Sequence, residues 1–442
     1  MGIQGGSLIK LCTLLAWACD FSELKHSEIV SEGETPSAVI DGNCWIYECA
    51  CGLVSGLTAG AAAAYAAFLK SYMVRIAYVR KCGWTPIIVF DGRSVPIKRA
   101  TNDKRAARRK KAAVKAKSGG RTSDLSSFKP THKLVHRLVL SLREAGETVF
   151  VAPHEGDPQC AYLANTGKAH VVITRDSDLI AHECKCIFFW NSVYKAAFPG
   201  GFGGKFYWKP SLWRCAKGLW KPIIKLGWDS FLSVCVIAGT DYNVGVYKVG
   251  IKKAVSLIAE HGTLEAVVSA LSDPARAKYR DAKVPEGFLV AANKAKLMFK
   301  HPLVFDPYNN IVCHARDLPA DSAPLIEVGS PNWMGRIPES REEAIALSRS
   351  ELHPETLAPY PPVAQAQADE TATVSTVKTV RRTSRRPVPN KLRPYKPPPR
   401  PSRRPAQREM LSDVEWNRLL NQHGIYFDVP QVLSSVNDCM II

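Results

Sequence analysis

The stretch AVID at residues 38–41 decides the fold, because it sets an uncharged, β-branched run directly before an aspartate. Compact apolar runs of the same kind occur at Pro86–Phe90, Thr148–Val151 and His170–Thr174. Such runs are typical of strands that are buried on both faces of a parallel sheet. The segments between them are Ala-rich or amphipathic, as crossover helices are. The sequence therefore predicts an α/β domain with a central, mostly parallel sheet and helices on both faces.

Acidic residues follow each of these four runs, at the point where the strand is expected to end. They are Asp41, Asp91, Glu155, Asp157, Asp176 and Asp178. Because open parallel sheets bind ligands outside the carboxyl ends of their strands, these side chains should gather along one edge. A single acid after a strand is commonly a helix N-cap, but capping does not explain acids after all four strands.

Clustered carboxylates without His or Cys favour hard cations, above all Mg²⁺, for which Mn²⁺ can substitute. An acidic set this rich predicts two ions, which can stabilise both the attacking and the leaving oxygen of a phosphodiester displacement.

Positive charge is concentrated in two segments of this 442-residue chain, whose formal net charge is +19. Residues 98–117 hold ten Lys and Arg against one acid, Asp103, and residues 378–408 hold twelve with no acid. Basic appendages attract polyanions, of which nucleic acid is the commonest, although solvated surface or a targeting signal could explain either run alone. A basic segment beside an acidic metal site suits a polynucleotide, whereas a glycosidase with paired carboxylates would not need it.

Cysteine usage and hydropathy exclude several other classes. The thirteen cysteines form no CxxC pair, which predicts free thiols in a reducing compartment and no zinc or redox motif. Leu11–Cys19 lacks a clear signal-peptide cleavage site. Cys49–Leu69 carries no charge but is mostly Ala and Gly, so we expect a close-packed buried helix there and no membrane association.

Six blocks resemble, in order, the conserved blocks of the structure-specific 5′-nuclease family that contains exonuclease 1 and the flap endonucleases. They are MGIQG (1–5), VIDGNCWIY (39–47), VFDG (89–92), APHEGDPQCAYL (152–163), VITRDSDLI (172–180) and GTDYNVGVYKVGIKKA (239–254). The weaker motifs HPLVFDP (301–307) and ELHPETLAPY (351–360) look more like exonuclease 1. The resemblance implies a PIN-like 5′-nuclease fold with a basic helical arch, a helix–two-turn–helix and a disordered basic C-terminal tail.

The resemblance also implies roles for individual residues. It adds Asp241 to the six predicted metal ligands, and it makes Lys98 and Arg105 catalytic cations at the foot of the arch. Two helical turns separate that pair, so both should face the same side. Tyr47 would stack on a base. The implied DNA-binding residues are Gly2, Tyr47, Arg109, Gly245, Gly250, Lys252 and Lys253. Carbonyl groups of the helix–two-turn–helix would hold a K⁺ ion.

The sequence departs from the family at two of these places. Arg175 stands where an acid usually precedes the DSD pair, and Lys248 replaces a glycine in the turn of the helix–two-turn–helix. The first adds positive charge beside two predicted metal ligands, and the second puts the potassium site in doubt.

The activity that the resemblance implies is Mg²⁺-dependent 5′→3′ exonuclease action on double-stranded DNA, with 5′-flap endonuclease activity, in mismatch repair, end resection and recombination. The implied partners are DNA at 5′ ends, nicks, gaps and flaps, and mismatch-repair proteins bound through the tail, for a nuclear monomer. A replication flap endonuclease is the first alternative, but Asp428 and Val429 occupy the aromatic positions of a clamp-binding box. A catalytically inactive DNA-binding scaffold and an RNA 5′-exonuclease are the others.

Composition divides the chain into four predicted parts. We expect a nuclease region with the basic arch at 1–118, a second nuclease region with the helix–two-turn–helix at 128–260, and a helical extension at 261–355. The remainder, 356–442, is rich in Pro, Ala, Thr and Arg and cannot bury enough apolar surface to fold by itself. Helical spacing within it, at 411–420, suits either a partner-binding helix or no ordered element.

Overall fold

The computed structural model describes residues 17–24, 29–118, 124–190, 203–209, 221–273, 281–319 and 332–360. Residues 1–359 and 430–442 form one compact unit and residues 360–429 a second, so almost all described residues belong to the first. Gly2, the basic run at 378–408 and the segment at 411–420 lie outside the described residues. The four predicted domain boundaries stay predictions.

A seven-stranded sheet forms the centre of the described fold, in the order β1-β7-β6-β5-β2-β3-β4. Its strands are β1 (Trp17–Asp20), β2 (Ser37–Asp41), β3 (Thr85–Phe90), β4 (Thr148–Val151), β5 (Val171–Thr174), β6 (Cys186–Trp190) and β7 (Gly203–Trp208). The strands from β2 to β6 run parallel, whereas β7 is antiparallel to both of its neighbours. The four predicted strands and the mostly parallel sheet are confirmed.

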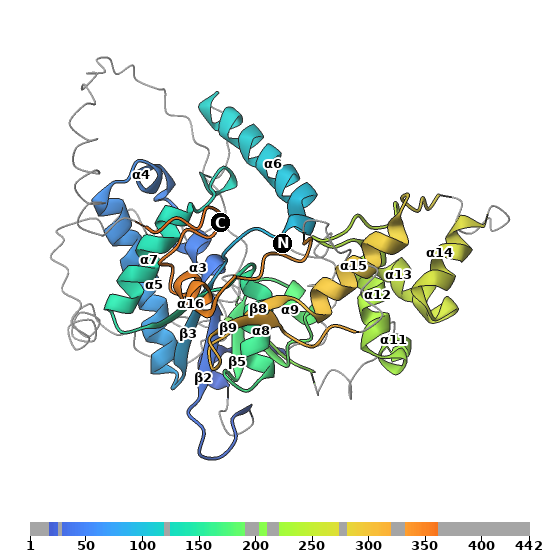
Figure 1. The fold of residues 1–442 in the computed structure, drawn as a ribbon, viewed down its shortest axis with the longest axis horizontal. Helices are drawn as coiled ribbons and strands as arrows, with labels where there is room; N and C mark the ends of the chain where they lie inside the picture. The colour runs from blue at the N-terminus through green and yellow to red at the C-terminus, as the bar shows by residue number, and fades with distance from the viewer. Residues whose placement is uncertain are drawn as a thin grey trace, which may run out of the picture. The chain divides into compact units, whose positions relative to one another are not determined.

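Helices cover both faces of this sheet, as predicted (Figure 1). The chain moves outward from β2 to β4 through α5 (Ala62–Lys81) and α7 (His132–Glu144), then returns to β5 and β6 through α8 (Gly156–Asn165) and α9 (Asp178–Ala181). Right-handed crossovers that run in opposite directions place their helices on opposite faces. The strand order therefore reverses between β5 and β2, which is where such sheets bind ligands.

The prediction of one buried helix over Cys49–Leu69 is wrong. The chain forms α3 (Gly42–Cys49) and α4 (Val54–Thr58) before α5 begins. Gly52 and Gly60 take φ angles of +74° and +73° between these helices, a left-handed conformation that ends a helix and that glycine adopts without strain.

A second break divides the helical pattern after the turn at 239–250. Gly262, with φ +80°, separates α13 (Ile251–His261) from α14 (Leu264–Ser272). No single helix in the described part of the chain is long and apolar enough to cross a membrane; α13 and α14 pass that test only as a pair, which is bent by 103°.

The turn at 239–250 belongs to a layer of helices that reaches the sheet. This layer consists of α11 (Lys221–Leu226), α12 (Trp228–Ala238), α13, α14 and α15 (Phe288–Lys300), and it is followed by the hairpin β8 (Leu303–Asp306) and β9 (Ile311–His314). The side chain of Gln159 ties α8 to this hairpin, since it donates to the carbonyl of Phe305 at 2.8 Å and accepts from its N–H at 2.7 Å. The hairpin is thereby held against α8.

The open edge of the sheet is covered by the segment that begins with α16 (Arg341–Ser348). Strand β4 pairs only with β3, so its other side has no strand partner among the described residues. Arg143 donates to the carbonyl of Val149 on that strand at 2.9 Å, to that of Ser348 at 3.3 Å and to that of Arg349. One guanidinium therefore joins α7, the edge strand and the end of α16.

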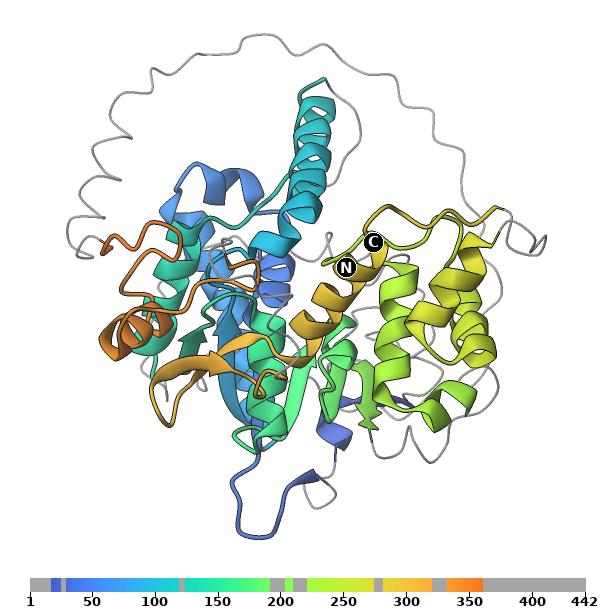
Figure 2. The same ribbon diagram turned by 45° about the vertical axis from the view of Figure 1, so that its right-hand side comes forward.

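The basic segment forms a helix that stands clear of the sheet in both views (Figures 1 and 2). A short 3-10 turn, η2 (Pro96–Lys98), leads into α6 (Arg99–Lys117), and the remaining 3-10 turns are η1 (Phe21–Glu23) and η3 (Asp124–Ser126). Ser118 is the C-cap of α6.

Candidate active site

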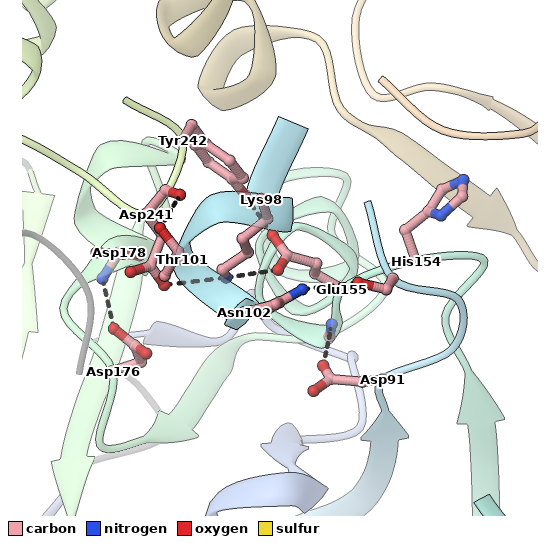
Figure 3. A network of polar contacts seen from close by, with 12 residues as sticks. Asp91, Lys98, Thr101, Asn102, His154, Glu155, Asp176, Asp178, Asp241 and Tyr242 are labelled. Atoms are coloured by element: carbon pink, nitrogen blue, oxygen red, sulfur yellow. Dashed lines mark hydrogen bonds and ion pairs between the residues drawn. The ribbon is translucent and has the colours of Figure 1, made fainter. Parts of the chain in front are cut away.

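All seven predicted carboxylates lie at the carboxyl edge of the sheet or reach it from the neighbouring turn. Asp41 ends β2 and Asp91 follows β3; Glu155 and Asp157 begin α8, Asp176 and Asp178 follow β5, and Asp241 follows α12. Figure 3 shows Asp91, Glu155, Asp176, Asp178 and Asp241 around one space. The gathering that the strand pattern predicts is present, while the role of these residues as metal ligands stays a prediction.

Asp41 is both a helix cap and a member of the cluster. Its carboxylate accepts from the N–H of Cys44 at 3.2 Å, which caps α3. It also accepts from the Cys44 thiol at 2.7 Å and from the Thr174 hydroxyl at 2.9 Å. Burial raises the pKa of Asp41 in spite of these donors.

Asp91 is fixed from two sides. It accepts from the N–H of Gly156 at 2.7 Å and from the side-chain amide of Asn43. Any Cβ on residue 156 would lie 3.0 Å from the Asp91 carboxylate, so glycine permits this approach. Although Asp91 keeps some open surface, burial of its carboxylate and then the charge of Asp41 raise its pKa to about 7.

Asp157 stands among the other acids. Burial raises its pKa well above the ordinary value, and the charges of Asp176, Asp41 and Asp178 raise it further. The acids after β5 are ordered locally, since Asp176 accepts from the N–H of Asp178 at 3.1 Å. Carboxylates this close repel one another, so this side of the cluster requires positive charge.

Lys98 supplies positive charge to the other side of the cluster (Figure 3). Its Nζ lies 2.5 Å from Glu155 Oε1 and 3.1 Å from Asp241 Oδ2, and its side chain is only 12% exposed. Burial alone would lower the pKa of Lys98, but the charges of these two carboxylates hold it above the ordinary value. Burial alone would raise the pKa of Glu155, but Lys98 and the Tyr242 hydroxyl together hold it below the ordinary value.

Arg105 lies on the same face of the basic segment, as predicted. Its guanidinium is 2.6 Å from Asp241 Oδ2, and the hydroxyl of Thr101 donates to the Asp241 carbonyl at 2.8 Å. Tyr242, the next residue, donates its hydroxyl to Glu155 at 2.5 Å. Sequence reasoning missed both Thr101 and Tyr242, although Thr101 has the three-residue spacing from Lys98 that places it on this face.

Tyr47 lies on α3. Its half-buried ring meets Phe128 edge-on at 5.8 Å. Burial raises the pKa of Tyr47, against the opposing charges of Arg109 and Arg105. The charge of Arg109, midway along α6, therefore acts on Tyr47.

Arg175, where the family has an acid, is an ion-pair partner of α3. Its guanidinium lies 2.8 Å from Glu48 Oε1, and the indole of Trp190 donates to the other oxygen of Glu48 at 3.1 Å. The cation beside Asp176 is therefore partly neutralised by a carboxylate outside the cluster.

The turn at 239–250 depends on one glycine. Any Cβ on Gly245 would come within 2.5 Å of the backbone of Ala238 and Gly239, so only glycine fits there. Gly250 is the N-cap of α13, and the exposed Lys252 and Lys253 occupy its first turn. The first turn of α13 thus carries two exposed lysines beside the free backbone N–H groups of a helix start.

Lys248 adopts φ +58°, a left-handed conformation in which glycine would carry less strain. Its carbonyl accepts from the ammonium of Lys253 at 3.2 Å. The positive charge of Lys253 therefore lies against the Lys248 carbonyl of the turn.

The donor set fits hard divalent cations, because it consists of carboxylate oxygens, and burial together with neighbouring carboxylates raises the pKa of Asp41, Asp91 and Asp157. In the part of the chain that the structure describes, no three His, Cys, Asp or Glu side chains are arranged closely enough to hold a metal ion as they stand. The cluster therefore has the donor chemistry of a divalent site, and its side chains would have to move closer together to coordinate an ion.

Comparison with known proteins adds the following. Residues 1–112 match the XPG N-terminal domain and residues 146–241 the XPG I-region. Exonuclease 1 of Arabidopsis thaliana is 29% identical over 298 residues, which are 65% of this chain and 37% of that protein. Exonuclease 1 of Danio rerio is 28% identical over 315 residues, 70% of this chain and 36% of that protein. The chain thus spans little more than a third of the length of these relatives.

Solved structures resemble the chain more loosely. The Holliday junction-resolving enzyme GEN1, in complex with product DNA and Mg²⁺, is 17% identical over 68% of this chain and 65% of that chain, with a TM-score of 0.46.

Proposed function

Because the chain belongs to the nuclease family that contains the XPG proteins and exonuclease 1, we propose that it is a Mg²⁺-dependent, structure-specific DNA nuclease. The observation that carries this proposal is the position of Lys98, between Glu155 and Asp241 at the rim of a carboxylate cluster. A lysine beside clustered acids suits an anionic substrate, because its ammonium group can leave a carboxylate and bind a phosphate of the substrate.

The chemistry is divided between the two sides of the cluster. Asp41, Asp91, Asp157, Asp176 and Asp178, joined by Glu155 and Asp241, would hold Mg²⁺ or Mn²⁺, which supplies Lewis-acid activation of water and phosphate when bound. Lys98 and Arg105 neutralise negative charge on the attacked phosphate. This charge is larger in the transition state than in the ground state, so the two cations stabilise the transition state more. Tyr47 orients the neighbouring base by stacking.

We further propose 5′→3′ exonuclease activity on double-stranded DNA with 5′-flap cleavage, in the nucleus, in mismatch repair, end resection and recombination. Its support is the likeness to relatives named exonuclease 1, together with the two block motifs at 301–307 and 351–360. A monomer that binds mismatch-repair proteins through its tail belongs to the same proposal. A potassium ion at the turn 239–250 is also part of the proposal, and it would share that turn with the Lys253 ammonium, which donates to the Lys248 carbonyl.

A single cleavage gel tests the proposed function. The full chain is incubated with 5′-recessed duplex DNA, 5′-flap DNA and duplex RNA, each with Mg²⁺, Mn²⁺ or EDTA. We expect short products from the 5′ end of the recessed duplex with either metal and none with EDTA. Preferred cleavage of the flap would favour the replication flap endonuclease, cleavage of RNA alone would favour an RNA exonuclease, and binding without cleavage would favour an inactive scaffold.

The two exposed lysines of α13 should act on DNA binding alone. Replacing Lys252 and Lys253 by alanine should weaken duplex affinity and lower the slope of log affinity against log salt by roughly two, because about two fewer counterions are released. The single-turnover rate at saturating protein should not change, since neither residue contacts the carboxylates. Filter binding across a salt series measures the slope, with Lys225→Ala on α11 as a control. A fall in saturated rate with an unchanged slope would contradict this role.

Residues after Tyr360 should contribute affinity without chemistry. Their twelve Lys and Arg at 378–408 are distant in sequence from every residue of the cluster. Deleting 361–442 should leave saturated turnover on a short 5′-recessed duplex nearly unchanged and weaken binding to longer DNA, with a shallower salt slope. An unchanged salt slope would show that the segment is only a linker, and lost turnover on the short duplex would contradict both interpretations.

A further inference from the structure

The loop Gly92–Ile97 joins the two halves of the site, because Asp91 precedes it and Lys98 follows it. Its position therefore sets how far the Lys98 ammonium reaches toward Glu155 and Asp241. On one side the loop is held by the strand-end segment before α8, through bonds from Gly92 N–H to the His154 carbonyl at 2.6 Å and from Arg93 N–H to the Pro153 carbonyl at 3.1 Å.

The other side of the loop is held by a segment far away in sequence, residues 332–360, which we call the strap. The N–H of Ile97 donates to the carbonyl of Trp333 at 3.3 Å. The ring of His154 lies between the strap and the loop, 3.1 Å from the Arg336 carbonyl and 3.2 Å from the Arg93 carbonyl. At one end, then, the strap fixes the residue next to Lys98.

Gly335 makes this end of the strap fit. Any Cβ there would lie 2.2 Å from Nε2 of His154, and its φ of +122° suits only glycine. The buried Trp333 and Met334 anchor the neighbouring backbone in the core.

The other end of the strap presents a single carboxylate to the loop. Glu355 Oε1 accepts from the N–H of Ser94 at 2.9 Å, and its Oε2 lies 3.6 Å from Arg93 Nε. The Ser94 hydroxyl in turn accepts from Asn102 on α6 at 2.7 Å. Glu355 thus acts on the loop and, through Ser94, on the helix that carries Arg105.

A closed turn holds Glu355 in place. His353 N–H donates to the Ala358 carbonyl and Leu357 N–H to the His353 carbonyl, both at 2.8 Å. The ring of His353 accepts from the N–H groups of Glu355 and Thr356 at 3.2 Å, and it packs edge-on against His132 of α7 at 4.8 Å. The turn is therefore ordered by its own hydrogen bonds and by packing on α7, and it does not depend on the loop Gly92–Ile97 for its conformation.

We propose that the strap is a positioning element of the nuclease site, in which Glu355 and Gly335 fix the loop Gly92–Ile97 and thereby hold Lys98 at its distance from Glu155 and Asp241. The inference rests on the proposed function. Glu355 touches neither the carboxylate cluster nor the site of a reacting phosphate, so it acts on the rate only through the loop. Preorganised placement of a charge is what makes it effective in a transition state.

The test uses the full chain, a short 5′-recessed duplex and Mg²⁺, and it measures the single-turnover rate at saturating protein, DNA affinity in EDTA and thermal unfolding. Glu355→Ala should lower the rate about tenfold, the effect of losing one hydrogen bond to a charged group. Glu355→Gln keeps the acceptor for Ser94 N–H and should recover most of the rate. Glu351→Ala removes an exposed glutamate of the same strap, whose nearest basic partner is Arg349 at 4.0 Å, and should change nothing.

The deciding measurement is a double-mutant cycle. In a Lys98→Ala background Glu355→Ala should cause far less than its tenfold loss of rate, because the main residue that it positions is absent. Gly335→Ala should show the same pattern from the other end of the strap, without any change of charge. An equal further loss in the Lys98→Ala background would mean general destabilisation and overturn the proposal.

The proposal also fails if the single-turnover rate of Glu355→Ala equals that of Glu351→Ala, or if Glu355→Ala weakens DNA affinity and leaves the rate unchanged. Failure of the proposed function is seen separately, as absence of cleavage by the unchanged protein.

Discussion

Asp176→Ala should abolish DNA cleavage and leave DNA binding intact or slightly stronger. Asp176 follows β5 and lies beside Asp178 and close to Asp157, whose pKa is raised by burial and then by the charges of Asp176, Asp41 and Asp178. Removing a metal ligand there should forfeit several kcal/mol of transition-state stabilisation, or about three orders of magnitude in rate. Binding is spared because the loss of a negative charge reduces repulsion of phosphate.

Single-turnover cleavage of a 5′-recessed duplex and a binding titration in EDTA measure the two effects. Asp317→Ala, at an exposed aspartate outside the cluster, is the control and should match the unchanged protein. Cleavage by Asp176→Ala within tenfold of the unchanged protein would remove Asp176 from the metal site.

Lys98→Ala should lower the single-turnover rate by roughly two to three orders of magnitude, the cost of one electrostatic contact to a transition state. Lys98 Nζ lies 2.5 Å from Glu155 and 3.1 Å from Asp241, and its side chain is almost entirely enclosed. Without it, burial and mutual repulsion should raise the pKa of Glu155, so the rate that remains should need a higher pH.

The control for this variant lies on the same helix. Lys104 is exposed on α6 and has no ion pair with the cluster among the described residues, so Lys104→Ala should affect affinity only. If Lys98→Ala weakens binding and leaves the saturated rate unchanged, Lys98 merely positions DNA.

The strands that carry the site could be predicted from the sequence because each is a buried parallel strand, and such strands have an apolar run with no alternation. The same pattern exists in β6 (CIFFW, 186–190), which was missed because no acid follows it. Strand β7 contains two glycines and a lysine, and it pairs antiparallel at the far side of β6. Its place depends on neighbours that no local pattern reveals.

The site residues also fall into those that local sequence patterns predict and those that they do not. Six carboxylates were predictable from strand ends, since parallel strands bring those ends together. Asp241 was not, because it comes from the turn after α12, and only a likeness to known sequences pointed to it. The breaks at Gly52 and Gly60 were missed because apolar composition predicts burial and says little about backbone conformation.

The covered edge of the sheet has a consequence for self-association. An uncovered edge strand offers unpaired N–H and carbonyl groups on which another chain can add a strand, and proteins block such edges to remain soluble. Here Arg143 saturates the Val149 carbonyl of β4 and ties the carbonyls after α16 across the same edge. A chain shortened to end before Arg341 would lose the segment across this edge and keep only the bond from Arg143 to Val149. Most backbone groups on the outer side of β4 would then be open to another strand, and the chain would tend to aggregate strand by strand even where the core still folds.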